Sequence, residues 1–188
     1  MREASSRGLS HLTPEGEARM VDVSAKAETV REAGARAVLR MKPATLAAIQ
    51  AGQVKKGDVL GVARTAGILA AKRTPDLIPL CHPLRITGVD VTFGLNRRAS
   101  TLTIETRVRT VDKTGVEMEA LTAAAVAALT VYDMVKGVEK GVTIAEVALV
   151  EKSGGKSGHW VRTERAPRGA GRKGSADGRA PGRRTGGA

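Results

Sequence analysis

The chain has 188 residues, enough for one domain with a core, and a formal net charge of +12 at pH 7. Aromatic residues make up only 2% of it, which disfavours a nucleic-acid module that stacks bases on aromatic side chains. The single cysteine, Cys81, excludes a disulfide within the chain, and no apolar run reaches the length of a membrane span. We therefore expect a cytoplasmic protein with neither a signal peptide nor a membrane contact.

Half of the positive charge lies in the C-terminal segment 161–188, which has eight Arg/Lys against two acidic residues and no Leu, Ile, Phe or Met. Such a segment cannot bury apolar surface, so we predict a disordered basic Arg/Gly-rich tail. A solvated tail is the favoured interpretation, with weak polyanion binding as the alternative. The predicted organisation is a flexible N-terminus at 1–12, one folded domain at 13–160, and this tail.

The first half of the chain carries alternating strand and helix signals. Apolar side chains at every second position predict strands at 20–24 and 32–41, although the alanine content of the second leaves a helix open. A helix is predicted over 43–51, where Pro occupies the first turn. Asp58 is predicted to cap a second helix that ends near Arg73, before a proline.

The segment 76–84 reads DLIPLCHPL, and its two prolines predict an extended chain without a helix. Alternating apolar residues then predict strands at 86–95 and 101–111. The residues between them, 96–100, have the composition of a hairpin turn.

An alanine-rich helix is predicted over 116–138, followed by a last strand at 143–150 and a Gly-rich loop at 152–158. Strands outnumber helices and a hairpin is present. We therefore predict an α+β sandwich, with a mostly antiparallel sheet and helices packed on one face.

Charged residues lie at both ends of the predicted long helix. Glu117 and Glu119 are in its first turn, and Asp133 and Lys136 share a face near its end. Helix-end electrostatics explains either pair taken alone. Glu117 and Asp133 lie roughly 24 Å apart at 1.5 Å per residue, so one pocket in one subunit cannot use both. If both ends are functional, the site joins two chains.

His82 follows Cys81 and precedes a proline, which holds its backbone extended on a loop. A metal site is disfavoured because no second cysteine or clustered histidine accompanies the pair. A cysteine nucleophile is also disfavoured, because an apolar flank raises the pKa of a thiol. His82 remains the candidate site residue of this loop.

Several cations lie in Gly-rich loops or beside predicted helix ends, where backbone N–H groups also attract anions. For any one of them a solvated surface position is the default, but together they predict an anion pocket. The Gly-Lys-Ser at 155–157 is not a phosphate-binding P-loop, because that pattern requires a glycine where Val150 stands. The candidate cations are Lys26, Arg31, Lys56, Lys72, Lys152 and Lys156.

Four strings, at 21–33, 55–84, 113–138 and 152–158, together resemble the cyclic pyranopterin monophosphate synthase (MoaC) family of molybdenum cofactor biosynthesis. LIPLCHPL and GVEMEALTAA are the most specific parts. The resemblance implies a ferredoxin-like fold and a homohexamer, a trimer of dimers, with sites at the dimer interface. It also implies a nucleotide-derived substrate, 3′,8-cyclo-7,8-dihydroguanosine 5′-triphosphate, which a lyase converts to cyclic pyranopterin monophosphate and pyrophosphate. It implies no redox cofactor and leaves Mg²⁺ with the triphosphate open.

The resemblance also implies roles for individual residues. The catalytic acid/base residues fall on Lys56, Asp133 and Lys136, and no metal ligand is implied. Substrate-binding residues fall on Leu80, Cys81, His82, Glu117, Met118, Glu119 and Lys152, with Lys26, Arg31, Lys72 and Lys156 as candidate triphosphate contacts. Such a site needs cations for the leaving pyrophosphate and groups that move protons near neutral pH.

Three rival functions remain at this point. The charge and the Arg/Gly tail fit a nucleic-acid-binding module, although we expect no specific nucleic-acid partner. A scaffold protein would leave the loop lysines and His82 without a role. Another phosphate-ester lyase on the same fold is the broader enzyme alternative.

Overall fold

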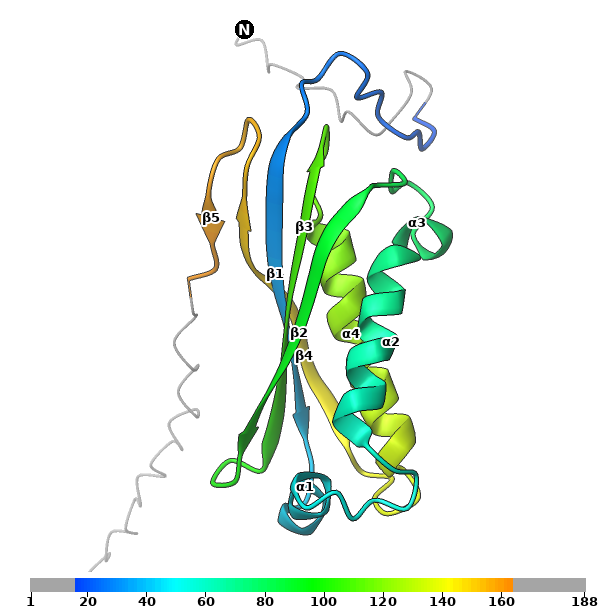
Figure 1. Cartoon of the computed structure of the whole chain (residues 1–188), viewed down its shortest axis with the longest axis vertical. Coiled ribbons are helices and arrows are strands. Elements are labelled where there is room, and N and C mark those ends of the chain that lie inside the picture. Colours follow the sequence, from blue (N-terminus) through cyan, green and yellow to red (C-terminus); the bar gives the residue numbers. More distant parts are fainter. Residues whose placement is uncertain (1–15, 164–188) are drawn as a thin grey trace, which may run out of the picture.

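The computed structural model describes residues 16–163. Five strands form a single antiparallel sheet in the order β2-β3-β1-β4-β5 (Figure 1). The strands are β1 (Thr29–Arg40), β2 (Ile86–Asn96), β3 (Thr101–Asp112), β4 (Thr143–Ser153) and β5 (Trp160–Val161). The helices are α1 (Pro43–Gln50), α2 (Val59–Lys72), α3 (Thr74–Leu77) and α4 (Glu117–Val135). The α+β sandwich with an antiparallel sheet is confirmed.

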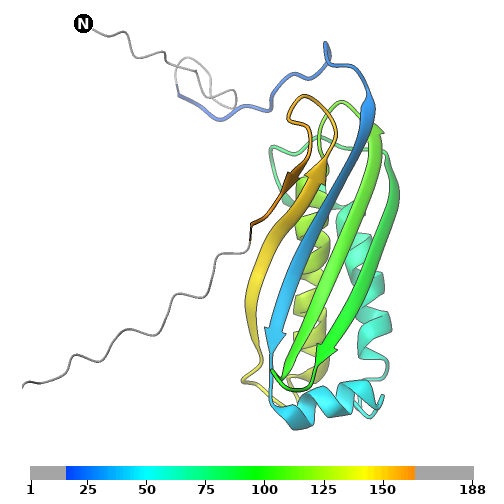
Figure 2. The same cartoon turned by 90° about the vertical axis from the view of Figure 1, so that its left-hand side faces the viewer.

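The two long helices, α2 and α4, lie side by side on one face of the sheet, and α1 lies across one end of it (Figure 1). Figure 2 shows the opposite face, which no described helix covers. Each strand therefore turns alternate side chains toward the helices. On β1 these are Ala33, Ala35, Ala37 and Leu39, all fully buried.

The contact between α2 and α4 is built from small side chains that bring the two backbones close together. The buried face of α4 carries five alanines, from Ala120 to Ala128. A Cβ on Gly67 of α2 would lie 3.1 Å from the carbonyl oxygen of Ala123, a tight contact that would push the two helices slightly apart, so glycine allows this close approach. Among the described helices only α4 has the length and hydropathy of a membrane span, but its buried alanines pack as those of a core helix do.

The first sequence prediction that fails is the strand at 20–24. The Asp22 carboxylate accepts a hydrogen bond from the backbone N–H of Ser24, at 2.8 Å, and a turn follows at 24–26. Asp and Ser side chains compete in this way with extended pairing, so alternation of valines alone was a misleading signal.

The segment 76–84 was also wrongly predicted to lack helix. Its first residues belong to α3, in which Pro75 occupies the first turn. A proline there sacrifices no helical hydrogen bond, so it can begin a short helix immediately after α2 has ended. A turn follows, in which the N–H of Cys81 donates to the carbonyl oxygen of Ile78 at 3.0 Å, so the predicted extended chain is also wrong there; residues 81–84 form neither helix nor strand.

The C-terminal boundary also differs from the prediction. β4 extends to Ser153, which places Lys152 in a strand, and the predicted tail begins with a residue of β5: Val161 pairs with Glu151. The guanidinium of Arg162 donates to the carbonyl oxygen of Leu149 at 2.6 Å. The predicted flexible segment 1–12 and the rest of the predicted tail, 164–188, lie outside the described residues.

Replacing Gly67 with leucine should destabilise the fold by about 1–3 kcal/mol, because the new side chain would force α2 away from α4. Urea unfolding followed by circular dichroism measures this change. Thr65→Leu, at an exposed position of the same helix, is the matched control and should change the unfolding free energy far less. Equal stability of the two variants would contradict the close-packing argument.

Candidate active site

Predicted site residues gather in two clusters at opposite ends of the two-helix layer. One cluster surrounds the start of α4, and the other joins the end of α4 to the loop before α2 (Figure 1). α4 is an unbroken helix from Glu117 to Val135. The rise of a helix therefore separates Glu117 from Asp133 by roughly 24 Å, and one chain does not bring the two clusters into one pocket.

The first cluster lines a cavity of about 400 Å³ between the N-terminal part of β1, the end of β4 and the start of α4. Two carboxylates, Glu32 and Glu117, share it with a larger number of cations. The cations are Lys26, Arg31, Lys113, Lys152 and Lys156. Positive charge thus exceeds negative charge in a concave site, which favours an anionic ligand.

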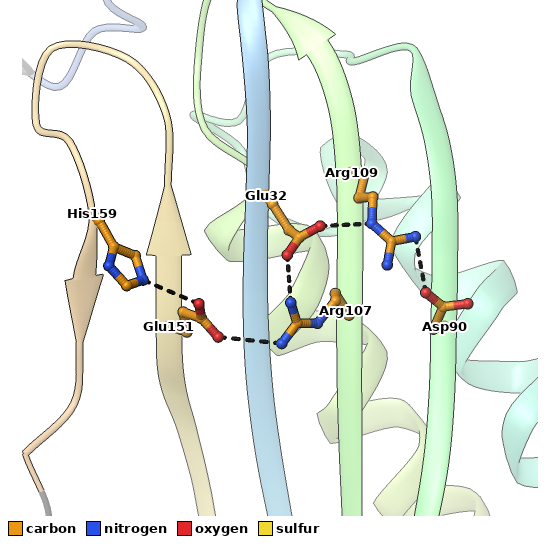
Figure 3. Close-up of polar contacts among 6 residues, drawn as sticks. All are labelled: Glu32, Asp90, Arg107, Arg109, Glu151 and His159. Carbon is orange, nitrogen blue, oxygen red and sulfur yellow. Dashed lines mark hydrogen bonds and ion pairs between the residues drawn. The ribbon is translucent and has the colours of Figure 1, made fainter.

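Glu32 does little to cancel that charge because its carboxylate is held by two arginines across the sheet (Figure 3). Arg109 Nε donates to it at 2.6 Å, and Arg107 donates to its other oxygen. Burial alone would raise the pKa of Glu32, but the hydrogen bonds from Arg109 and Arg107 outweigh burial and lower it. The pair of arginines is tied in turn to Asp90 and Glu151, and Glu151 also contacts His159.

A second cavity, of about 260 Å³, adjoins the first and shares Lys26, Thr114, Gly115 and Glu117 with it. Its further walls combine apolar side chains with three groups that could bind a polar ring edge. The apolar walls are Val21, Val23, Leu80, Leu84 and Met118, and the polar groups are Cys81, His82 and Glu119. The two cavities form a groove with a cationic part and a mixed apolar and acidic part.

Glu117 and Glu119 differ in their surroundings although they lie on the same helical turn. Lys152 Nζ contacts Glu117 Oε1 at 2.9 Å, so Glu117 is paired. Glu119 is only 2% exposed, and burial, reinforced by the charge of Glu117, raises its pKa to about 7. Near neutral pH, Glu119 can therefore hold or release a proton beside the groove.

The structure supports the view that Cys81 is a poor nucleophile. Burial, and then the charge of Glu119, raises the pKa of its thiol. The thiolate is the reactive form, so Cys81 serves this groove as a wall residue.

The ring of His82 holds the irregular segment 20–26 against the groove. His82 Nε2 lies 2.8 Å from the carbonyl oxygen of Val21. A carbonyl oxygen only accepts, so Nε2 carries the hydrogen and Nδ1 is left with a lone pair in the neutral ring. Lys113 fixes the same segment, because its Nζ donates to the carbonyl oxygen of Ser24 at 2.8 Å. Sequence reasoning missed Lys113, although its Lys-Thr-Gly string lies directly before α4.

In the second cluster, Asp133 joins both candidate acid/base lysines. Lys56 Nζ lies 2.8 Å from Asp133 Oδ2 and also donates to the backbone carbonyl of Asp133, and Lys136 Nζ lies 2.7 Å from Oδ1. The hydrogen bonds from Lys136 and Lys56 lower the pKa of Asp133 to about 2. Asp133 in turn raises the pKa of Lys136, so this lysine is an ammonium group at neutral pH.

The structure leaves one predicted contact outside both clusters. Lys72 is exposed at the end of α2 and lines neither cavity. Within residues 16–163, no three His, Cys, Asp or Glu side chains gather as they would around a metal ion.

A family model described as the MoaC family matches residues 20–155. The chain belongs to the MoaC family. Three relatives, each named cyclic pyranopterin monophosphate synthase, show how close the similarity is. The protein of Heliobacterium modesticaldum is 59% identical over 156 residues, which is 83% of this chain and 98% of its own length. Those of Roseiflexus sp. and Geobacter metallireducens are 60% and 56% identical, over 81% and 84% of this chain and 97% and 99% of their own. In this MoaC chain, the matched range contains both clusters except for Lys156 at the rim of the first cavity.

Replacing Glu119 with glutamine should remove a pH dependence of stability. Because the pKa of Glu119 is raised from 4.5 to about 7, the folded state holds its proton more strongly than the unfolded state between these values. The stability that it contributes below pH 4.5 is therefore lost as the pH rises to 7, by up to about 3 kcal/mol.

Urea unfolding of both proteins at pH 5 and pH 7.5 measures this loss. Wild type should lose more stability than Glu119→Gln between the two pH values, since other titrating groups are common to both. An equal loss of unfolding free energy in the two proteins would mean that ionisation of Glu119 does not destabilise the folded state.

Proposed function

We propose that this chain is a cyclic pyranopterin monophosphate synthase. It converts 3′,8-cyclo-7,8-dihydroguanosine 5′-triphosphate to cyclic pyranopterin monophosphate and pyrophosphate, as a phosphorus–oxygen lyase of molybdenum cofactor biosynthesis. The observation that supports it most is the groove at the start of α4. Its cationic part fits a triphosphate, and its adjoining part offers carboxyl groups to a purine- or pterin-like ring.

The cations would bind the phosphates by charge-assisted hydrogen bonds. Lys26, Arg31 and Lys156 have no carboxylate partner within the described residues, so their charge is available to a ligand. Cyclising the 5′-phosphate while expelling pyrophosphate places negative charge on the leaving group. Cations held at that position lower the barrier, and Mg²⁺ could accompany the triphosphate without a protein site of its own.

Glu117, Met118 and Glu119 would bind the ring system. Carboxyl oxygens can accept hydrogen bonds from the N–H groups of a guanine or pterin edge. Glu119 has a pKa of about 7, so it can also donate a proton to a ring nitrogen. Recognition would rest chiefly on hydrogen bonds, since neither cavity is lined by a Phe, Tyr or Trp side chain and His82 is the one aromatic ring among the lining residues.

The catalytic residues would be Lys56, Asp133 and Lys136, supplied by a neighbouring subunit. Opening a purine ring requires protons to be delivered and removed. The pair of ammonium groups on one carboxylate can deliver them, and Asp133 fixes the direction of both. Since the two clusters lie at opposite ends of α4, a complete site requires a second chain. A homohexamer built as a trimer of dimers, with sites at the dimer interface, would provide it in the cytoplasm.

A nucleic-acid-binding module fits the described structure less well. Three cations without a carboxylate partner among the described residues, Lys26, Arg31 and Lys156, line a concave cavity at one end of the domain. The aromatic residues do not form a row of platforms: the guanidinium of Arg64 lies over Phe93, and that of Arg162 over Trp160. Base stacking would need faces that these contacts occupy.

The test of the function is an assay for pyrophosphate and pterin product from the cyclic triphosphate. The full chain and a chain truncated after residue 163 should both be active, since the groove and both clusters lie within the retained part. Activity that disappears on truncation, together with polyanion binding, would instead favour the nucleic-acid alternative.

Lys56→Ala and Asp133→Asn should each abolish turnover while the oligomer stays intact. Either change removes a proton-transfer group or the carboxylate that orients it, but both side chains are about half exposed and are not needed for the core. Pyrophosphate release and light scattering measure the two properties. Pyrophosphate release at the wild-type rate by either variant would refute the assigned roles.

A further inference from the structure

Arg31 stands out among the cations of the groove because its guanidinium is fixed but not neutralised. Nη2 donates to the carbonyl oxygen of Lys113 at 3.3 Å, while Nε is buried without a hydrogen-bond partner. No carboxylate in the described part of the chain pairs with it. An arginine left charged in a cavity wall is suited to bidentate binding of a phosphate.

Two consecutive glycines cover this side chain. Gly154 and Gly155 have φ values of +95° and +69°, in the left-handed region that favours glycine. A Cβ on Gly155 would overlap Nη1 and Cζ of Arg31. A Cβ on Gly154 would instead overlap the backbone carbonyl oxygen of Val30. A side chain at position 154 would therefore clash first with the backbone of β1, whereas a side chain at position 155 would clash with the guanidinium of Arg31.

We propose that Gly155 is a positioning residue that holds the Arg31 guanidinium in the cavity wall, ready to bind the polyphosphate of an anionic ligand. The side chain is then ordered before the ligand arrives, so binding costs less conformational entropy than it would for a mobile arginine. The identity of the ligand as the cyclic triphosphate rests on the proposed function. The binding of a polyphosphate does not.

Alanine at position 155 should displace the end of the Arg31 side chain, since the overlapping atoms belong to a flexible group and not to the backbone. The chain offers a matched control. Gly158 has a φ of +64°, similar to that of Gly155, but no atom lies within 4 Å of a Cβ placed there. Gly158→Ala therefore reports the backbone strain of a left-handed alanine in the same turn, where Gly158 N–H donates to the carbonyl oxygen of Gly155, without a direct overlap with Arg31.

The experiment measures binding of inorganic tripolyphosphate by calorimetry to wild type, Gly155→Ala, Gly158→Ala, Arg31→Ala and the double variant of positions 31 and 155. Gly155→Ala should weaken binding by about tenfold, the usual effect of losing one charge-assisted contact. Gly158→Ala should remain within about twofold of wild type. The double variant should bind no more weakly than Arg31→Ala, because a residue that acts through Arg31 has no effect once the guanidinium is gone.

Several results would overturn the proposal. These are wild-type affinity in Gly155→Ala, equal weakening by the two glycine variants, the same Gly155→Ala effect with and without Arg31, or no tripolyphosphate binding by wild type. If Gly155→Ala fails to fold, recovery of folding in the Arg31→Ala background supports the contact, and failure in both backgrounds overturns it.

Turnover of the cyclic triphosphate is measured in parallel, and Gly155→Ala should raise KM more than it lowers kcat. If wild type has no turnover while tripolyphosphate binding follows the expected pattern, the proposed function fails and the role of Gly155 stands.

Discussion

The close packing of α4 against α2 and the sheet is the constraint on which the rest of the structure depends. Alanines on α4 and Gly67 on α2 let the helix axes approach, and the core is filled by backbone and methyl groups with little aromatic bulk. Such a seam tolerates little change in side-chain volume. It keeps α4 unbroken over 19 residues. The two charged clusters are consequently held apart, each at one end of a rigid element.

The net positive charge that the groove offers to a ligand depends on which cations the nearby carboxylates already pair with. Glu32 is taken up by Arg107 and Arg109, and Glu117 is paired with Lys152. The remaining cations are therefore left for a ligand. At the other end of α4 a single carboxylate, Asp133, pairs with both Lys56 and Lys136 and raises the pKa of Lys136. One cluster is suited to binding an anion and the other to donating protons, so together they would supply both needs of the proposed reaction.

Much of the fold could be predicted from local signals. The alternation of apolar residues indicated β1, β2 and β3, and the alanine content indicated α4. Asp58 caps α2 by accepting from the N–H of Gly61, as its position suggested. The prediction failed where a local sequence signal is compatible with two structures or is too short to detect. Pro75 begins a helix as readily as it ends one, and β5 is only two residues long, so its pairing with β4 leaves no period to detect.

The candidate site was predicted in part. Motif strings indicated the residues of both clusters, and the length of the helix indicated that they lie apart. Contacts between distant segments could not be read in the same way. Three such contacts depend on how distant segments pack together. Lys152 pairs with Glu117, Glu32 pairs with Arg107 and Arg109, and Gly155 lies against Arg31. Lys72 lines neither cavity of this chain, and its contact with the triphosphate stays a prediction.

Subunit mixing tests the central claim, that a complete site needs the two ends of α4 from different chains, most directly. Asp133→Asn and Lys152→Ala are each expected to be inactive, because one removes a proton-transfer group and the other leaves the Glu117 carboxylate unpaired in the groove that binds the substrate. After verified subunit exchange, half of the dimers combine one of each and contain one intact site of two. Pyrophosphate release should therefore recover to about a quarter of the wild-type rate. No recovery, with exchange confirmed by mass spectrometry, would contradict it.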